Sequence, residues 1–238
     1  KLREAGISIQ NLTIIDSHDS LCEQFHKYTN RIDMSYLRSP IVHHIHPDPF
    51  HLKKFAKMNQ YINPTFGRYQ RPQTEMFMDH TYTQIHNYHL NQCHIQSYVQ
   101  RIEKKQRKWS ITTSHHSVIQ TDCVVLAQGC HNDPFIPSAF TQAKDVCHIF
   151  SDHFNSQLFS QSSHVIGSGI SAAHLTLKVL KLDKNKIVHL WMNKNIDIQH
   201  FDADPGWLGP KKMKAFLNHS SHEEKLQTVL KDCLLYTS

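Results

Sequence analysis

Short apolar blocks separated by polar turns run along the chain and predict a series of β-strands. The expected strands span residues 12–16, 94–103, 108–114, 122–126, 163–166 and 186–191. Apolar residues at helical spacing predict helices over residues 51–61, 74–91 and 171–182. The blocks at 94–103 and 108–114 form a β-meander around a basic turn, whereas the other strands alternate with helices. This alternation is typical of the α/β class.

The strand expected at 163–166 leads through a glycine-rich turn into a helix. The turn and the start of the helix comprise Gly167, Ser168, Gly169, Ile170, Ser171 and Ala172. In a dinucleotide-binding turn, Gly167 permits the tight turn, Gly169 lets a pyrophosphate approach the backbone, and Ala172 allows close packing of helix on strand. The pyrophosphate then lies on the helix N-terminus. A merely structural strand–turn–helix is the alternative, but the chain holds only 7 glycines in 238 residues, which disfavours a chance match.

The strand expected at 186–191 ends without an acidic residue, because Asn193 and Lys194 follow it. An acid at this position binds the ribose of NAD, whereas a basic residue can meet the 2′-phosphate of NADP. Lys194 therefore favours NADPH as the nicotinamide cofactor. A solvent-facing lysine is the alternative interpretation.

The first expected strand, 12–16, ends in Asp16. A Rossmann unit places an acid at this point against an adenosine ribose. Asp16 could instead cap the following turn, in which Ser17 and Asp19 are ordinary turn residues. Farther along, three prolines within residues 36–50 exclude a regular helix and predict a long ordered loop, a kind of segment that often carries function.

Charge, cysteine and histidine usage narrow the function classes. The net charge is +6, and the one dense basic run, residues 104–108, falls at the expected hairpin turn, so we interpret it as a solvated loop rather than a nucleic-acid site.

The six cysteines form no CxxC pair, which predicts separate reduced thiols in a cytoplasmic protein. His86 and His89 could share a helical face, but no HExxH pattern accompanies them, so we expect no metal site. No apolar run approaches the roughly 20 residues of a membrane span.

Both ends of the sequence predict missing structure. Residues 1–6 are typical of the last turn of a helix closed by Gly6 and followed by a strand, so we expect a further strand and a glycine motif upstream of Lys1. The final residues, 234–238, resemble a translated adapter scar, and we expect them to be non-native.

These features together resemble the two-dinucleotide flavoproteins, and more narrowly the flavin-dependent N-hydroxylating monooxygenases of lysine or ornithine. The resemblance covers residues 1 to about 217, and its carriers are Asp16, the loop 35–38, residues 125–129 followed by Pro134 and Pro137, and residues 165–173. The sequence departs from the family at Gln128, Ile170 and His174, where threonine, glutamine and glutamate are usual. The segment after Phe50 also lacks the asparagine with which the amino-acid hydroxylases bind substrate.

The resemblance implies two Rossmann-like dinucleotide-binding units joined by a β-meander, both incomplete: an FAD-binding domain over residues 1–155 and an NAD(P)-binding domain over 156–238. It implies FAD and NADPH as cofactors. The implied cofactor-binding residues are Asp16, Arg38, Ser39, Ala127, Gln128, Gly129, Gly167, Ser168, Gly169, Ile170, Ser171, Ala172 and Lys194. The flavin supplies the chemistry, so the resemblance implies no catalytic side chain.

The activity implied is an NAD(P)H-dependent flavin oxidoreductase, a monooxygenase that hydroxylates a small-molecule primary amine through a flavin hydroperoxide. Two alternatives stay open. A disulfide or quinone reductase of the two-dinucleotide type would need a redox cysteine pair near the first flavin helix, where Cys22 stands alone. A non-catalytic nucleotide-sensing module would explain the departures at Gln128, Ile170 and His174, because sites rather than folds determine function.

Overall fold

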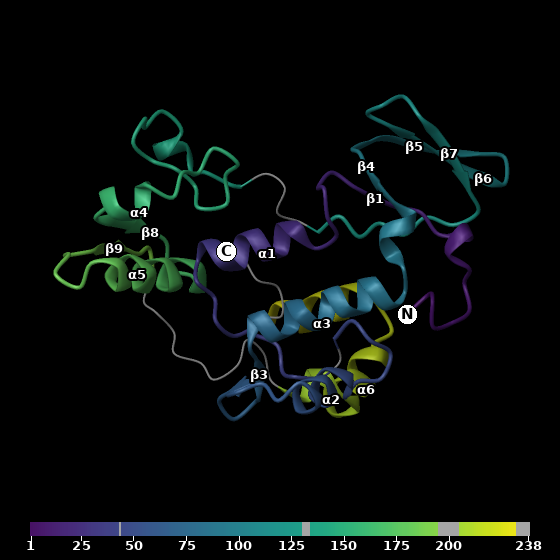
Figure 1. The fold of residues 1–238 in the computed structure, drawn as a ribbon, viewed down its shortest axis with the longest axis horizontal. Coiled ribbons are helices and arrows are strands. Elements are labelled where there is room, and N and C mark those ends of the chain that lie inside the picture. The colour runs from purple at the N-terminus through teal and green to yellow at the C-terminus, as the bar shows by residue number, and fades with distance from the viewer. Residues whose placement is uncertain (43, 130–133, 195–204, 232–238) are drawn as a thin grey trace.

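The computed structural model describes residues 1–42, 44–129, 134–194 and 205–231 (Figure 1). Its helices are α1 (Glu23–Arg31), α2 (His51–Met58), α3 (Thr74–Asn87), α4 (Leu158–Gln161), α5 (Ile170–Leu182), α6 (Pro210–Leu217) and α7 (His222–Lys231). Its strands are β1 (Ile14–Asp16), β2 (Thr65–Phe66), β3 (Arg71–Pro72), β4 (His94–Gln96), β5 (Val99–Lys105), β6 (Lys108–Thr113), β7 (Val118–Thr121), β8 (His164–Ile166) and β9 (His189–Trp191). Short 3-10 turns are η1 (Ile9–Asn11), η2 (Leu90–Cys93), η3 (Ser138–Phe140) and η4 (Pro205–Leu208).

Two separate pairs of parallel strands define the α/β architecture. In the first pair, β1 lies beside β4, and in the second, β8 lies beside β9. Parallel neighbours need a crossover connection. Helices α1, α2 and α3 lie between β1 and β4 along the chain, and α5 lies between β8 and β9. The predicted α/β class with two Rossmann-like units is therefore confirmed.

The β-meander lies between these two units in the sequence. Strands β5, β6 and β7 form one antiparallel sheet in that order. Lys105 pairs with Lys108, so the basic run makes a two-residue hairpin turn in which Gln106 has a φ of 56°. The predicted hairpin turn is confirmed, and the neighbouring carboxylates of Glu103 and Asp122 lie within 4 Å of its lysines, at 3.6 and 3.7 Å.

The strand predicted at 122–126 does not form. Instead, β7 ends at Thr121, and residues 122–129 run on without regular structure. A strand needs a neighbour for its backbone N–H and C=O groups. In this structure β7 takes the free edge of β6, and β1 pairs with β4 alone. Val125 and Leu126 consequently stand 73% and 70% exposed rather than buried.

The main hydrophobic core lies between α2 and α3, which lie next to each other in Figure 1. It is built from Ile41, Leu52, Ala56 and Met76. The start of α3 also holds the loop that precedes this core, because Thr74 N–H donates to Ser35 O at 2.9 Å and Thr74 Oγ1 donates to Met34 O at 2.6 Å. These bonds fix the backbone of the loop that carries Arg38.

The C-terminal end of α1 contacts the second half of the chain. Lys178 Nζ, on α5, donates to Asn30 O at 2.8 Å and to Arg31 O at 3.0 Å. A cation at the carbonyl end of a helix is favoured by the helix dipole. Lys181 adds an ion pair with Asp33 at 2.6 Å. Within the described ranges, no helix is long and apolar enough to cross a membrane.

Candidate dinucleotide-binding site

Gly167 turns the chain sharply between β8 and α5. Its φ is +146°, a conformation that residues with a side chain rarely adopt. A Cβ at this position would lie 3.1 Å from Cβ of Ala172 on the first turn of α5. The two small residues therefore let helix and strand pack closely, which is the role that the sequence predicts for Ala172. The predicted strand–turn–helix over 163–182 is confirmed.

Gly169 has a different environment. It is the N-cap of α5 with an ordinary φ of −93°, and a Cβ there would meet no atom within 4 Å. The N–H groups of the first helical turn, Ile170 to Ala172, have no partner within their own helix. Open space in front of unpaired N–H groups at the positive end of a helix dipole is suited to an anion. The described residues therefore fit the pyrophosphate of a dinucleotide at this turn.

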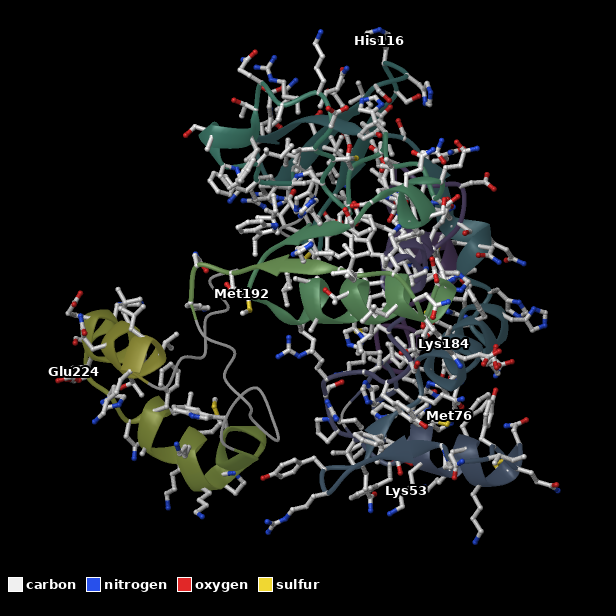
Figure 2. All side chains as sticks on the ribbon, turned by 90° about the vertical axis from the view of Figure 1, so that its left-hand side faces the viewer. Lys53, Met76, His116, Lys184, Met192 and Glu224 are labelled. Carbon is white, nitrogen blue, oxygen red and sulfur yellow. The ribbon has the colours of Figure 1, made fainter. Side chains whose placement is uncertain are left out.

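The end of β9 meets this turn. Gly167 N–H donates to Trp191 O at 2.9 Å, and Ser168 Oγ donates to Asn193 Oδ1 at 2.6 Å. Figure 2 shows Met192, just after β9, and Lys184, just after α5, at opposite ends of α5, so the end of β9 lies by the helix N-terminus. The side chain of Lys194, two residues after Met192, is exposed. The structure thus brings Lys194 to the same edge as the glycine turn.

The Ser168–Asn193 bond is a contact that the sequence analysis did not predict. The sequence signal for it is the position of Asn193, directly after a predicted strand. A distance of 2.6 Å is typical of a hydroxyl bonded to a carbonyl oxygen rather than to an amide N–H. The oxygen of the Asn193 amide therefore faces Ser168, and its Nδ2 is not used in this bond.

Asp16 lies at the carboxyl end of β1, as predicted, and it caps the turn that follows. Its Oδ1 accepts the His18 backbone N–H at 2.9 Å and lies 2.7 Å from His18 Nδ1. Burial acts to raise the pKa of Asp16, but the hydrogen bonds from His18 and the charges of His18 and His94 bring the pKa below its usual value. The capping interpretation is therefore observed, and Oδ2 takes no part in these two contacts.

Arg38 and Ser39 follow the loop that α3 holds. Arg38 is half-buried and Ser39 is exposed. Burial lowers the pKa of His174 on α5, Asp33 opposes this effect, and the positive charges of Arg38 and Arg71 add to it. The charge of Arg38 thus acts on His174, a residue of α5.

Ala127, Gln128 and Gly129 follow β7 along the chain and belong to neither parallel strand pair. All three are exposed and belong to the irregular segment that replaces the expected strand, with Gly129 at a φ of +70°. No hydrogen bond joins them to β1 or to α1 in the described part of the chain. The strand expected before them, 122–126, is absent, and their role as flavin contacts stays a prediction.

The structure also locates the histidines, cysteines and chain ends that the sequence singles out. Among the described residues, no group of three histidine, cysteine or acidic side chains could hold a metal ion. Cys22, Cys93, Cys123 and Cys147 are free thiols, whereas Cys130 and Cys233 lie outside the described residues, as do His43 and the expected non-native end, 234–238. Residues 1–6 form hydrogen-bonded turns ending at Gly6, with a φ of +91°, rather than a helix.

Comparison with known proteins identifies the family. The model of the pyridine nucleotide-disulphide oxidoreductase family matches residues 1–234, and the chain therefore belongs to this family. The family uses FAD and NAD(P)H, and its members are flavin-dependent oxidoreductases.

One solved structure is similar, a bacillithiol disulfide reductase from Staphylococcus aureus, with 16% identity and a TM-score of 0.47. The match covers 87% of this chain, and the chain spans 56% of that protein's length. No curated protein matches the chain.

Proposed function

We propose that this chain belongs to an NADPH-dependent flavin monooxygenase that hydroxylates a primary amine in a small molecule. In this proposal residues 1–155 bind FAD and residues 156–238 bind NADPH. Gly169 and the N-terminus of α5 hold the nicotinamide dinucleotide by its pyrophosphate. Asp16 Oδ2 binds a ribose hydroxyl of FAD, and Arg38 and Ser39 contact the flavin from the loop that α3 holds.

In this proposal the cofactors perform the chemistry and the side chains hold the cofactors. Bound FAD supplies the oxygen chemistry, and the nicotinamide supplies the reducing equivalents. Asn193 and Lys194 place a donor and a cation where the 2′-phosphate of NADPH would lie. The protein's own task is to bind and orient the two cofactors.

One observation favours a monooxygenase over a disulfide reductase: the pKa of the thiols near β1. Disulfide exchange needs a thiolate, which forms where the thiol pKa is lowered. Desolvation and the nearby carboxylate of Asp16 raise the pKa of Cys22. Burial raises the pKa of Cys93, whose thiol contacts Leu90 O at 3.1 Å. Both thiols are therefore poor nucleophiles.

Disulfide reduction is the second candidate, favoured by the description of the family that matches residues 1–234. The two candidates differ in what consumes NADPH. We expect purified protein supplied with FAD to oxidise NADPH faster when primary amines and oxygen are present, with a product heavier by one oxygen atom. Stimulation by disulfides under anaerobic conditions, with no response to amines, would establish the reductase instead. Gly169→Val is the matched control, because it should weaken NADPH binding and so lower either activity when NADPH is limiting.

A further inference from the structure

Three histidines form a continuous contact from the surface into the core between α2 and α3. His46 stacks on His51 with ring centroids 3.7 Å apart, and His51 Nδ1 lies 2.8 Å from His80 Nε2. His80 is 0% exposed and packs its edge against Phe55, with ring centroids 5.1 Å apart. We call His46, His51 and His80 the histidine clasp, because His46 and His51 stack within segment 44–51 and His51 joins that segment to His80 on α3.

The bonding of His80 restricts where protons can lie. Its Nδ1 is buried and has no hydrogen-bond partner among the described residues. A buried N–H without an acceptor costs more than a buried lone pair. The favoured arrangement therefore leaves Nδ1 of His80 unprotonated, with one proton shared between His80 Nε2 and His51 Nδ1, and the remaining proton of the pair on His51 Nε2.

An additional proton has no acceptable position in this arrangement. It would lie either on the buried Nδ1 of His80, where nothing accepts it, or between two nitrogens that are 2.8 Å apart and already share one proton. From these contacts we infer that the histidine clasp is acid-sensitive: protonation breaks the His51–His80 bond and releases segment 44–51 from α3.

Burial and the surrounding charges keep the imidazole rings of His51 and His80 neutral above the pH at which the clasp opens. Burial first, and then the positive charges of His51, His46 and His44, lower the pKa of His80 to about 4. His51 faces His46, Asp48, Lys54 and Glu4, and burial is the main cause of its lowered pKa. Asp48 is itself paired with Lys54 at 2.7 Å, and Glu4 lies 3.8 Å from His46 Nε2.

The sign of the effect follows from the direction of the shift. A histidine whose pKa is lower in the folded state stabilises that state fully above its unfolded pKa of about 6.5, and this contribution is lost as the pH falls toward the folded pKa. For His80, the opening equilibrium of segment 44–51 should rise about thirtyfold between pH ~8 and pH ~5.

The experiment is hydrogen exchange of the full chain at these two pH values, corrected for intrinsic exchange. We expect segment 44–51 to open about thirtyfold more readily at the lower pH. His80→Gln, which keeps a hydrogen-bonding group beside His51, should remove most of this dependence, because only the lowered pKa of His51 remains. His86→Gln is the matched control, because His86 is exposed on the same helix, and it should leave the dependence intact.

A second measurement does not depend on any variant folding. The ring of His80 should titrate in the native protein far below the usual histidine range in NMR. A His80 pKa near 6.5, or equal opening of segment 44–51 at both pH values, would overturn the proposal.

The clasp has a consequence for the flavin only if the proposed function holds, because Arg38 and Ser39 lie just before this segment. Flavin affinity should then fall over the same pH interval. The exchange experiment contains no flavin, so a failed clasp and a failed flavin assignment give different results.

Discussion

The turns that follow β8 and β1, one strand of each parallel pair, expose different chemical groups. After β8, the turn is built from Gly167 and Gly169 and opens onto the unpaired N–H groups of α5. After β1, the connection over residues 17–22 contains no glycine, and its backbone N–H groups are partly taken by side chains, since Asp16 Oδ1 binds His18 and Glu23 Oε2 accepts from Ser20 N–H at 3.2 Å.

This difference separates two kinds of nucleotide contact. A backbone turn with open space can surround a pyrophosphate. A turn closed by its own side chains can only present a carboxylate at its edge. Under the proposed function, the β8 turn would supply the pyrophosphate site for the nicotinamide nucleotide, and Asp16 would supply a single ribose contact for the flavin.

Gly167→Val should have the largest effect of the substitutions at these two turns. The new side chain would meet Ala172 and would hold a strained φ, so we expect a loss of about 3 kcal/mol in the free energy of unfolding and loss of NADPH binding by more than about a hundredfold. Chemical denaturation and calorimetric titration measure the two quantities. Gly67→Ala is the control, because Gly67 shares a positive φ of +71° but has no neighbour within 4 Å.

Gly169→Val should separate binding from folding. Its side chain would enter the open space in front of α5, so NADPH affinity should fall about thirtyfold or more, while the free energy of unfolding changes by less than about 1 kcal/mol. Flavin content should not change. Loss of flavin with unchanged NADPH affinity would mean that the two sites are assigned the wrong way round.

Asp16→Asn tests the other turn. Removing the charge should weaken FAD binding about tenfold, because a hydrogen bond to a charged group contributes about 1.5 kcal/mol, and NADPH affinity should stay constant. Fluorescence titration with FAD measures the change. His18→Ala keeps the carboxylate and should lower FAD affinity less; an equal loss in both variants would favour a purely structural Asp16.

Lys194→Ala should have the smallest effect. An exposed cation contributes modestly, so NADPH affinity should fall about fivefold and NADH affinity should not change. The difference should shrink as salt is raised. Equal losses for both nucleotides would argue against a contact with the 2′-phosphate.

The sequence predicted the β8 turn well because the evidence there is local. Glycine spacing, a strand before and a helix after all lie within 163–182, and the structure has them in that order. The helices α2 and α3 were predicted for the same reason, with ends displaced by a few residues.

The features that the sequence did not predict correctly depend on pairing between distant segments. The apolar run at 122–126 has strand composition, but a strand also needs a free neighbouring edge, which composition does not report. The Ser168–Asn193 bond and the contact of His51 with His80 likewise join residues that are 25 and 29 positions apart. Such contacts follow from tertiary packing rather than from local pattern.

The most direct test of the account is hydrogen exchange of the protein with and without NADP⁺. We predict protection of the backbone amides at residues 167–173 and at the end of β9, with residues 17–23 unchanged. Protection at residues 17–23 with no change at the β8 turn would contradict the assignment of the dinucleotide site.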